Sequence, residues 1–127
     1  MAATPEGRFY MKARADLATL PSTKFTKIQQ VGRVGDSDIM LCVAGHYVEI
    51  ELKKDSRTWP DPLQLWNLHE ANRCLGYGFV GHPSNWDELF SFLQFLAGTE
   101  KERLEVPRCL KLRPIKPGVK PSSPLLK

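Results

Sequence analysis

The chain has 127 residues, of which 42% are hydrophobic and 25% are charged, and its formal net charge is +4. This length and composition are typical of one globular domain, and no apolar run reaches the roughly 20 residues that a membrane-spanning helix needs. The N-terminus lacks the apolar region of a signal peptide, and the three cysteines lack zinc-like spacing. We therefore expect a protein of the reducing cytoplasm, or of the nucleus if it is eukaryotic, with no membrane partner.

The positive charge is concentrated at the C-terminus. Residues 108–127 hold six of the 18 basic residues and none of the 14 acidic ones, so residues 1–107 carry a net charge of about −2. Half of the ten prolines lie within 107–127, where they disfavour regular helix and strand. We therefore divide the chain into a folded domain at 1–106 and a basic, proline-rich, flexible tail at 107–127. Such a tail could bind phosphates, aid solubility or dock another protein.

The sequence before the tail predicts elements in the order αβββαβα. Thr4-Pro5-Glu6 starts a helix, because threonine is a good cap, proline fits the first turn and the acid faces the positive end of the helix dipole. This helix ends near Leu20, before Pro21. The later elements are a strand at 24–30, strands at 39–43 and 47–52 joined at Ala44-Gly45, a helix from the Asp61 cap to about Leu75, a strand at 77–81, and an apolar helix from Ser84 or Asn85 to about Ala97.

The hairpin at 39–52 predicts one apolar face and one polar face. A turn centred on Ala44-Gly45 pairs residues whose numbers sum to 89, which sets Asp38 opposite Glu51. The polar face then carries Asp38, Met40, Cys42, Glu49, Glu51 and Lys53. Two opposed carboxylates repel each other unless they share a proton, bind a cation or are fully solvated. The pair suits a hard divalent cation such as Mg²⁺, and a solvated face on a half-exposed hairpin is the simpler alternative.

These residues resemble a known nuclease motif. Asp38, twelve intervening residues and Glu51-Leu52-Lys53 are similar to the bipartite motif of the PD-(D/E)XK nucleases. More narrowly, the chain resembles the virus-type replication-repair nuclease (VRR-NUC) family over residues 4–96. The further features that carry this resemblance are Gly35-Asp36-Ser37-Asp38, Thr4-Pro5-Glu6-Gly7, Gln64 early in the helix after the motif, and Leu75-Gly76-Tyr77-Gly78 before the last strand.

The resemblance implies a restriction-endonuclease-like α/β fold, with an αβββαβ core whose mixed central sheet is flanked by helices. It also implies hydrolysis of DNA phosphodiesters with a divalent metal, Mg²⁺ or Mn²⁺. We expect this activity to serve replication, repair or recombination and to act on branched or junction DNA, while the sequence leaves open a flap, a four-way junction, a nick or plain duplex as the substrate. By position, the resemblance implies that Asp38, Glu51 and the Leu52 carbonyl bind the metal. Lys53 would orient the attacking water or stabilise the phosphate. Glu6 would lie near the metal or order the first helix, and Gln64 would brace the active-site strands.

Each of these residues also has an ordinary structural interpretation. Asp38 could cap a turn, Glu6 could serve the helix dipole alone, and Gln64 could serve the capping box alone. Acidic residues are depleted inside strands, which favours a functional role for Glu51, whereas a lysine at a strand end such as Lys53 is often only solvated.

Two neighbouring acids could be confused with the expected ligands. Asp36 lies two residues before Asp38, and Glu49 lies two residues before Glu51 on the same face. The spacing to Lys53 favours Glu51, and the Ser-Asp form favours Asp38. We therefore expect Glu49 to be a solvated acid.

The aromatic residues raise further expectations. Helical spacing places Trp66 in the core, whereas Trp59 lies in a loop with Lys54 and Arg57 and could contact nucleic acid. The last helix carries more apolar side chains than one buried stripe requires, which favours a homodimer with two sites on one substrate. The rival functions are a non-catalytic DNA-binding or assembly protein with a nuclease-like fold, and an adaptor whose tail binds a partner.

Overall fold

The computed structural model describes residues 4–28 and 38–114, and the elements within them follow the expected αβββαβα order. They are α1 (Pro5–Leu17), β1 (Thr23–Ile28), β2 (Ile39–Val43), β3 (His46–Leu52), α2 (Pro62–Arg73), β4 (Tyr77–Gly81), α3 (Trp86–Ala97) and the short 3₁₀ helix η1 (Arg108–Leu110). The expected strand at 24–30 begins one residue earlier, and its last two residues lie outside the described ranges. No helix in the described ranges is both long enough and apolar enough to cross a membrane.

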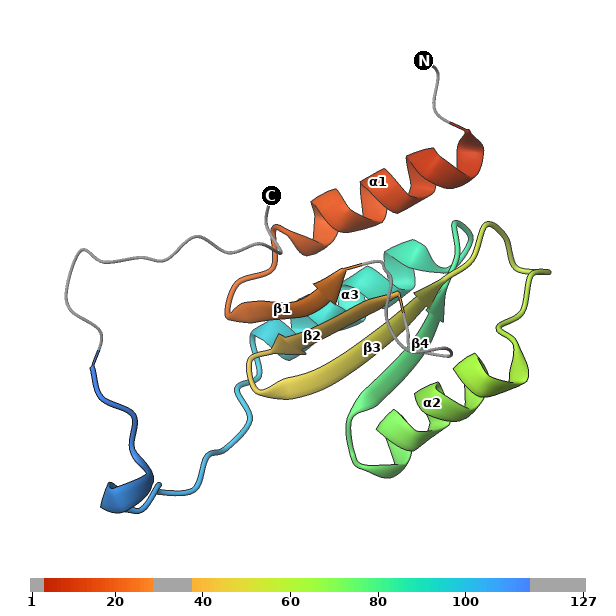
Figure 1. Cartoon of the computed structure of the whole chain (residues 1–127). Coiled ribbons are helices and arrows are strands. Elements are labelled where there is room, and N and C mark those ends of the chain that lie inside the picture. Colours follow the sequence, from red (N-terminus) through yellow and green to blue (C-terminus); the bar gives the residue numbers. More distant parts are fainter. Residues whose placement is uncertain (1–3, 29–37, 115–127) are drawn as a thin grey trace.

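The four strands form one mixed sheet in the order β1-β2-β3-β4 (Figure 1). The β1/β2 and β2/β3 pairs are antiparallel, and β4 runs parallel to β3. Helices α1 and α3 cover one face of the sheet, and α2 lies against the other (Figure 1). The expected α/β fold, with a mixed central sheet flanked by helices, is therefore confirmed.

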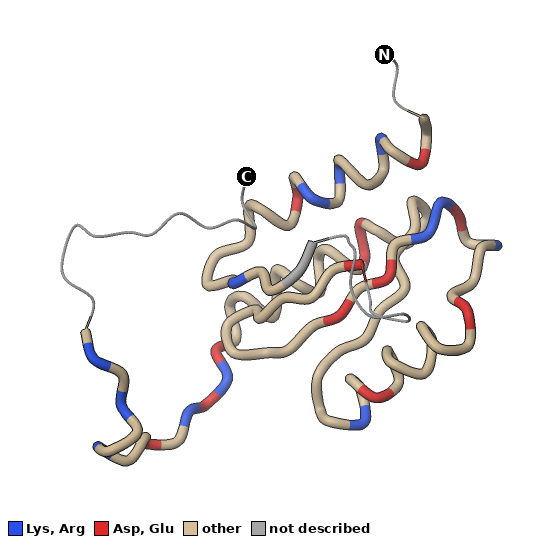
Figure 2. Tube along the Cα trace, in the orientation of Figure 1, with Lys and Arg blue, Asp and Glu red and all other residues tan. Residues whose placement is uncertain are grey.

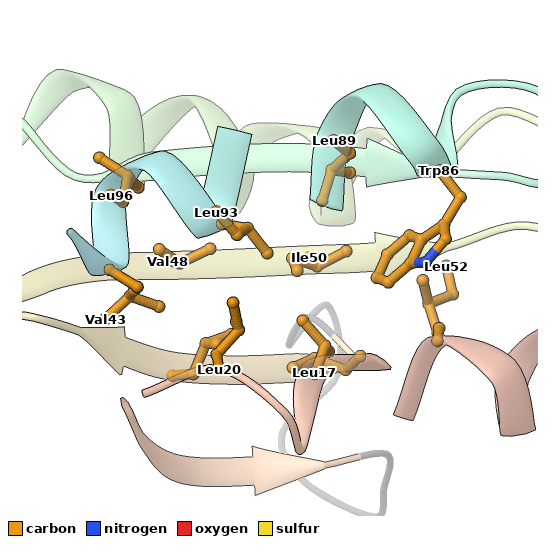
Figure 3. Packing of buried hydrophobic residues seen from close by; sticks show 14 of the residues in the cluster. Leu17, Leu20, Val43, Val48, Ile50, Leu52, Trp86, Leu89, Leu93 and Leu96 are labelled. Carbon is orange, nitrogen blue, oxygen red and sulfur yellow. The ribbon is translucent and has the colours of Figure 1, made fainter. Parts of the chain in front are cut away.

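The apolar face of the β2–β3 hairpin is the centre of the core. Its side chains are at most 3% exposed and pack against α1 and α3 (Figure 3). They are Ile39, Leu41, Val43, Val48, Ile50 and Leu52. Shifting the strand pairing by one residue would move all of these side chains to the opposite face, so burial of this face specifies the register.

The hairpin turn lies where the sequence predicts it. Ala44 (φ 49°) and Gly45 (φ 91°) both have positive φ, as a two-residue turn that matches the strand twist requires. The pairs Ile39–Ile50 and Leu41–Val48 follow, so the predicted register is confirmed. Alanine adopts this conformation at a cost, and two hydrogen bonds hold it in place: Ala44 N–H donates to the Ser22 carbonyl at 2.7 Å, and the Ala44 carbonyl accepts from Lys101 N–H at 2.9 Å.

Helix α2 packs closely on the polar face of the sheet because of Gly78. This residue pairs with Glu49 in the parallel register, and a Cβ atom there would lie 2.3 Å from the Leu68 carbonyl oxygen. Only a residue without a side chain allows the helix this close approach. Gln64 lies one turn before Leu68 on the same helix.

One core prediction is wrong. Trp66 is 58% exposed, because the face of α2 that meets the sheet carries Leu68 and Ala71, and a residue two positions before Leu68 points to the opposite side of a helix. Two helix ends also differ from expectation. Helix α1 ends at Leu17 and not near Leu20, in a turn where the Thr19 hydroxyl donates to the Asp16 carbonyl. Helix α2 ends at Arg73 and not near Leu75, and Leu75 adopts the left-handed conformation with φ 68°.

Beyond Lys101, whose N–H bonds to the hairpin turn, the chain extends away from the sheet (Figure 1). The described part of the expected tail, residues 107–114, is exposed, and its only helical element is η1, directly after Pro107. Residues 115–127 lie outside the described ranges, as does the lead-in to Asp38 that includes Asp36.

Candidate metal and active site

Asp38 and Glu51 lie next to each other at one end of the sheet. Asp38 immediately precedes β2, Glu51 is the second-last residue of β3, and the Ile39–Ile50 pair fixes their neighbourhood. Figure 2 shows acidic positions close together at this end of the two strands. The Asp38 carboxylate is also anchored to β3, because its Oδ2 accepts the backbone N–H of Leu52 at 2.9 Å.

Glu51 is an unusual residue because its carboxylate is buried and only partly satisfied. The residue is 2% exposed, and its buried Oε1 atom makes no hydrogen bond of standard geometry within the described residues, although the carboxyl group and backbone N–H of Asp38 lie close enough to interact with the Glu51 carboxyl. The other oxygen, Oε2, accepts from Gln64 Nε2 at 3.0 Å and lies 3.6 Å from Lys53 Nζ. A buried carboxylate oxygen without a partner carries a large desolvation cost.

The electrostatics of Glu51 reflect this position. Burial, and after it the negative charge of Asp38, raises the pKa of Glu51 to about 7, while the Lys53 ammonium partly opposes the rise. In the absence of a cation, the fold therefore favours the protonated carboxyl up to near-neutral pH.

Gln64 joins the helix cap to the acidic pair. It is the third helical residue of α2, and with Asp61 it forms the predicted capping box: its Oε1 accepts from Asp61 N–H at 3.0 Å, and its N–H donates to Asp61 Oδ1 at 2.9 Å. The same Oε1 accepts from Lys53 Nζ at 3.3 Å, while Nε2 holds Glu51. The two interpretations of Gln64 are thus compatible, since one side chain caps the helix and orients both Glu51 and Lys53.

Lys53 lies just beyond β3 and is held from two sides. Its backbone N–H donates to the Gly81 carbonyl at 2.8 Å, which continues the parallel pairing with β4. Its side chain is 18% exposed and reaches both Gln64 and Glu51. The ammonium group is therefore placed at the acidic pair and is not simply solvated.

Tyr10 is a further residue of the site, which the sequence motif does not include. Its hydroxyl donates to the Leu52 carbonyl oxygen at 3.0 Å, the same carbonyl that the family resemblance suggests as a metal ligand. Burial raises the pKa of Tyr10 to about 12, and the charges of Asp38 and Glu6 add to the rise. Glu6 lies one turn earlier in α1 and also interacts with this hydroxyl, so it approaches the site through Tyr10. The signal in the sequence was the four-residue spacing between Glu6 and Tyr10, which puts both on one helix face.

Glu49 differs from Glu51 although both lie on the polar face. It is half-buried and accepts a hydrogen bond from the Tyr47 hydroxyl at 2.5 Å. The expectation of a fully solvated Glu49 is therefore wrong, because the side chain is half-buried and hydrogen-bonded.

The donor atoms at the site are of the kind that a hard divalent cation requires. Asp38 and Glu51 offer carboxylate oxygens, Leu52 offers a carbonyl, and the unsatisfied Oε1 of Glu51 is the kind of atom that a bound cation would neutralise. No group of three or more His, Cys, Asp or Glu side chains suited to a metal exists within the described ranges. Carboxylate and carbonyl oxygens of this kind are the ligands that Mg²⁺ takes in proteins.

Comparison with protein-family models, with curated proteins and with solved structures finds no match for this chain.

Proposed function

We propose that this protein is a divalent-metal-dependent DNA nuclease of the VRR-NUC type, within the PD-(D/E)XK nucleases. The observation that carries the proposal is the buried Glu51 carboxylate, which has one unsatisfied oxygen and lies beside Asp38 and within 3.6 Å of the Lys53 ammonium. Burying the Glu51 carboxylate next to the Asp38 carboxylate is unfavourable for folding. Its presence is best explained by a bound cation and by chemistry that uses it.

Each residue contributes a definite task in this proposal. Asp38 and Glu51 hold Mg²⁺ or Mn²⁺, together with the Leu52 carbonyl, and Tyr10 orients that carbonyl. A bound ion would supply Lewis acidity at this point, which makes water a better nucleophile and stabilises negative charge on a phosphate. Lys53 donates hydrogen bonds from Nζ to the attacking water or to a phosphate oxygen.

The substrate is DNA in this proposal, and branched or junction DNA is its expected form. Lys and Arg positions, interspersed with Asp and Glu, lie along the loop after β3 and along the segment after α3 (Figure 2). Both segments can contact phosphates, and such contacts weaken steeply as salt concentration rises.

A second copy of the chain is the proposed protein partner. Helix α3 buries Leu89, Leu93 and Leu96 against the sheet but leaves Phe92 36% exposed and Phe95 64% exposed. A face of this kind supports the homodimer predicted from the sequence. Sedimentation at micromolar concentration tests it: a dimer is expected for the wild type, and a monomer would contradict it.

The nuclease proposal is tested by cleavage of labelled branched and linear DNAs with and without Mg²⁺ or Mn²⁺. Glu51→Gln keeps the shape of the side chain and is expected to lose about 100-fold or more in rate, the usual scale for removing a key electrostatic group. Glu49→Gln, a change of the same kind on the same strand face, is the matched control and should keep most of the activity.

Equal rates for the wild type and Glu51→Gln would refute the catalytic assignment. Tight DNA binding without cleavage under any metal would favour the non-catalytic DNA-binding protein.

A further inference from the structure

The loop that joins β3 to α2, residues 53–61, places an exposed tryptophan between two anchored stretches of backbone. Trp59 is 62% exposed, although the chain on both sides of it is well anchored. On one side, Asp55 Oδ1 accepts from Arg57 N–H at 2.9 Å and from the N–H and hydroxyl of Thr58 at 2.8 and 2.9 Å. On the other side, Pro60 is buried and Asp61 starts α2 in its capping box.

The three tryptophans of the chain differ in what their rings do. Trp86 is 2% exposed, donates its Nε1–H to Asp16 at 2.8 Å and packs edge-on against Phe9, so it belongs to the core. Trp66 is exposed on the outer side of α2, next to Asn67. Only Trp59 combines an exposed ring with an ordered loop that begins at the candidate site.

The first residue of this loop, Lys53, and a residue just beyond its other end, Gln64, both lie close to Glu51. Lys53 and Gln64 bond to each other at 3.3 Å, and both approach Glu51. Trp59 is six residues from Lys53, so an extended chain limits their separation to about 20 Å. At about 3.4 Å per nucleotide along one strand, the ring lies within roughly six nucleotides of a phosphate held at the site.

The charges around Trp59 favour nucleic acid over a protein partner. Residues 53–61 contain three cations, Lys53, Lys54 and Arg57, and two acids. Asp55 is engaged inside the loop, Asp61 in the α2 capping box and Lys53 at Glu51, which leaves Lys54 and Arg57 as the cations nearest to Trp59 in the sequence. Cations beside an exposed aromatic ring are the usual arrangement for binding single-stranded nucleic acid, because the ring stacks on a base while the cations contact the backbone.

We propose that Trp59 is a stacking site for an unpaired nucleobase, and that the protein binds DNA with a single-stranded segment next to the scissile phosphate. This inference rests on the nuclease function proposed above and specifies its substrate. A base that is part of a duplex is already stacked on both faces, so the ring selects flaps, overhangs and frayed ends over blunt duplex.

The test is equilibrium binding of the full-length protein in the presence of EDTA, so that cleavage does not affect it. The probes are a labelled oligothymidylate of about 12 nucleotides, within the site size of one single-strand-binding domain, an abasic strand of the same length, and a blunt duplex. Trp59→Ala is expected to bind oligothymidylate about tenfold more weakly than the wild type, whereas Trp59→Phe should keep most of the affinity. Trp66→Ala is the matched control and should stay within about twofold of the wild type, as an exposed substitution usually does.

The abasic strand separates stacking from phosphate contacts. The wild type and Trp59→Ala should bind it equally, since it offers no base to the ring, and both should bind the blunt duplex equally. Equal affinity of the wild type for the abasic and base-bearing strands would overturn the proposal and leave the ring to a protein partner. A loss at Trp66→Ala as large as that at Trp59→Ala would overturn it as well. Circular dichroism of each variant identifies any that fails to fold, and Trp59→Phe then decides the question by retention of affinity.

The stacking site and the nuclease function can fail separately. Metal-dependent cleavage together with unchanged oligothymidylate binding by Trp59→Ala would overturn the stacking site and keep the nuclease. Binding that depends on Trp59, in a protein that cuts no DNA under any metal, would support the stacking site and remove the nuclease.

Discussion

The two faces of β3 bury neighbouring residues to the same degree with opposite consequences. Ile50 is 0% exposed on the apolar face, and Glu51 is 2% exposed on the polar face. Ile50 lies in a continuous cluster of apolar side chains from α1, α3 and the hairpin (Figure 3). Glu51 instead has an unsatisfied oxygen and a raised pKa. Burial stabilises the fold on one face and opposes it on the other, so the polar face is where a functional explanation is needed.

The largest expected effect on stability comes from the apolar face. Ile50→Ala leaves a cavity in the centre of the core and should lower the free energy of unfolding by about 2–5 kcal/mol. Chemical denaturation measures this loss. A loss below about 0.5 kcal/mol, the scale of a surface substitution, would contradict the central place of Ile50 in the core.

On the polar face, the free energy of unfolding should depend on pH through Glu51. The pKa of Glu51 is about 7 in the folded protein, above its ordinary value of 4.5, so the folded state binds the proton more tightly than the unfolded state. This contribution to stability is therefore fully present below about pH 4.5 and is lost as the pH rises to about 7, a change on the order of 3 kcal/mol without a cation.

Glu51→Gln isolates this contribution, because it removes the titrating group and keeps the size of the side chain. The variant should be at least as stable as the wild type at pH 8, and the difference between them should shrink towards pH 4. Denaturation curves at several pH values, in EDTA, measure it. A constant difference between wild type and variant across this range would contradict the raised pKa.

A smaller effect is expected where α2 meets the polar face. Gly78→Ala places a Cβ atom 2.3 Å from the Leu68 carbonyl oxygen, so the helix has to shift. We expect a loss of about 1–3 kcal/mol in the free energy of unfolding, as for an overpacked core. Because Gln64 moves with α2, activity should fall even under conditions where the variant is fully folded. Gly98→Ala is the matched control, since a Cβ there would lie 3.7 Å from its nearest neighbour.

The smallest effect is expected at Tyr10. Tyr10→Phe removes the donor to the Leu52 carbonyl and should cost about 1 kcal/mol of stability, as for one hydrogen bond. If this carbonyl is a ligand, Mn²⁺ should also bind several-fold more weakly to the variant. Calorimetry measures the affinity, and unchanged binding would show that Tyr10 supports the fold alone.

The sequence predicted the parts of the molecule that depend on local patterns. The apolar alternation and the turn at Ala44-Gly45 predicted the hairpin register, and its continuation beyond the Ile39–Ile50 pair brings Asp38 close to Glu51. The capping pattern gave Asp61 and Gln64. Tyr10 was missed because its partner, Leu52, is 42 residues away in the chain. Trp66 was misplaced because helical spacing alone does not reveal which face of α2 meets the sheet, and the close approach at Gly78 determines that face.

The most direct test of the central claim is the binding of Mn²⁺ to the acidic pair at pH 8, measured by calorimetry or by electron paramagnetic resonance. The wild type and Glu49→Gln should bind an ion at this site with similar affinity, and Glu51→Gln should lose it. Unchanged ion binding in Glu51→Gln would contradict the assignment of Asp38 and Glu51 as the metal centre.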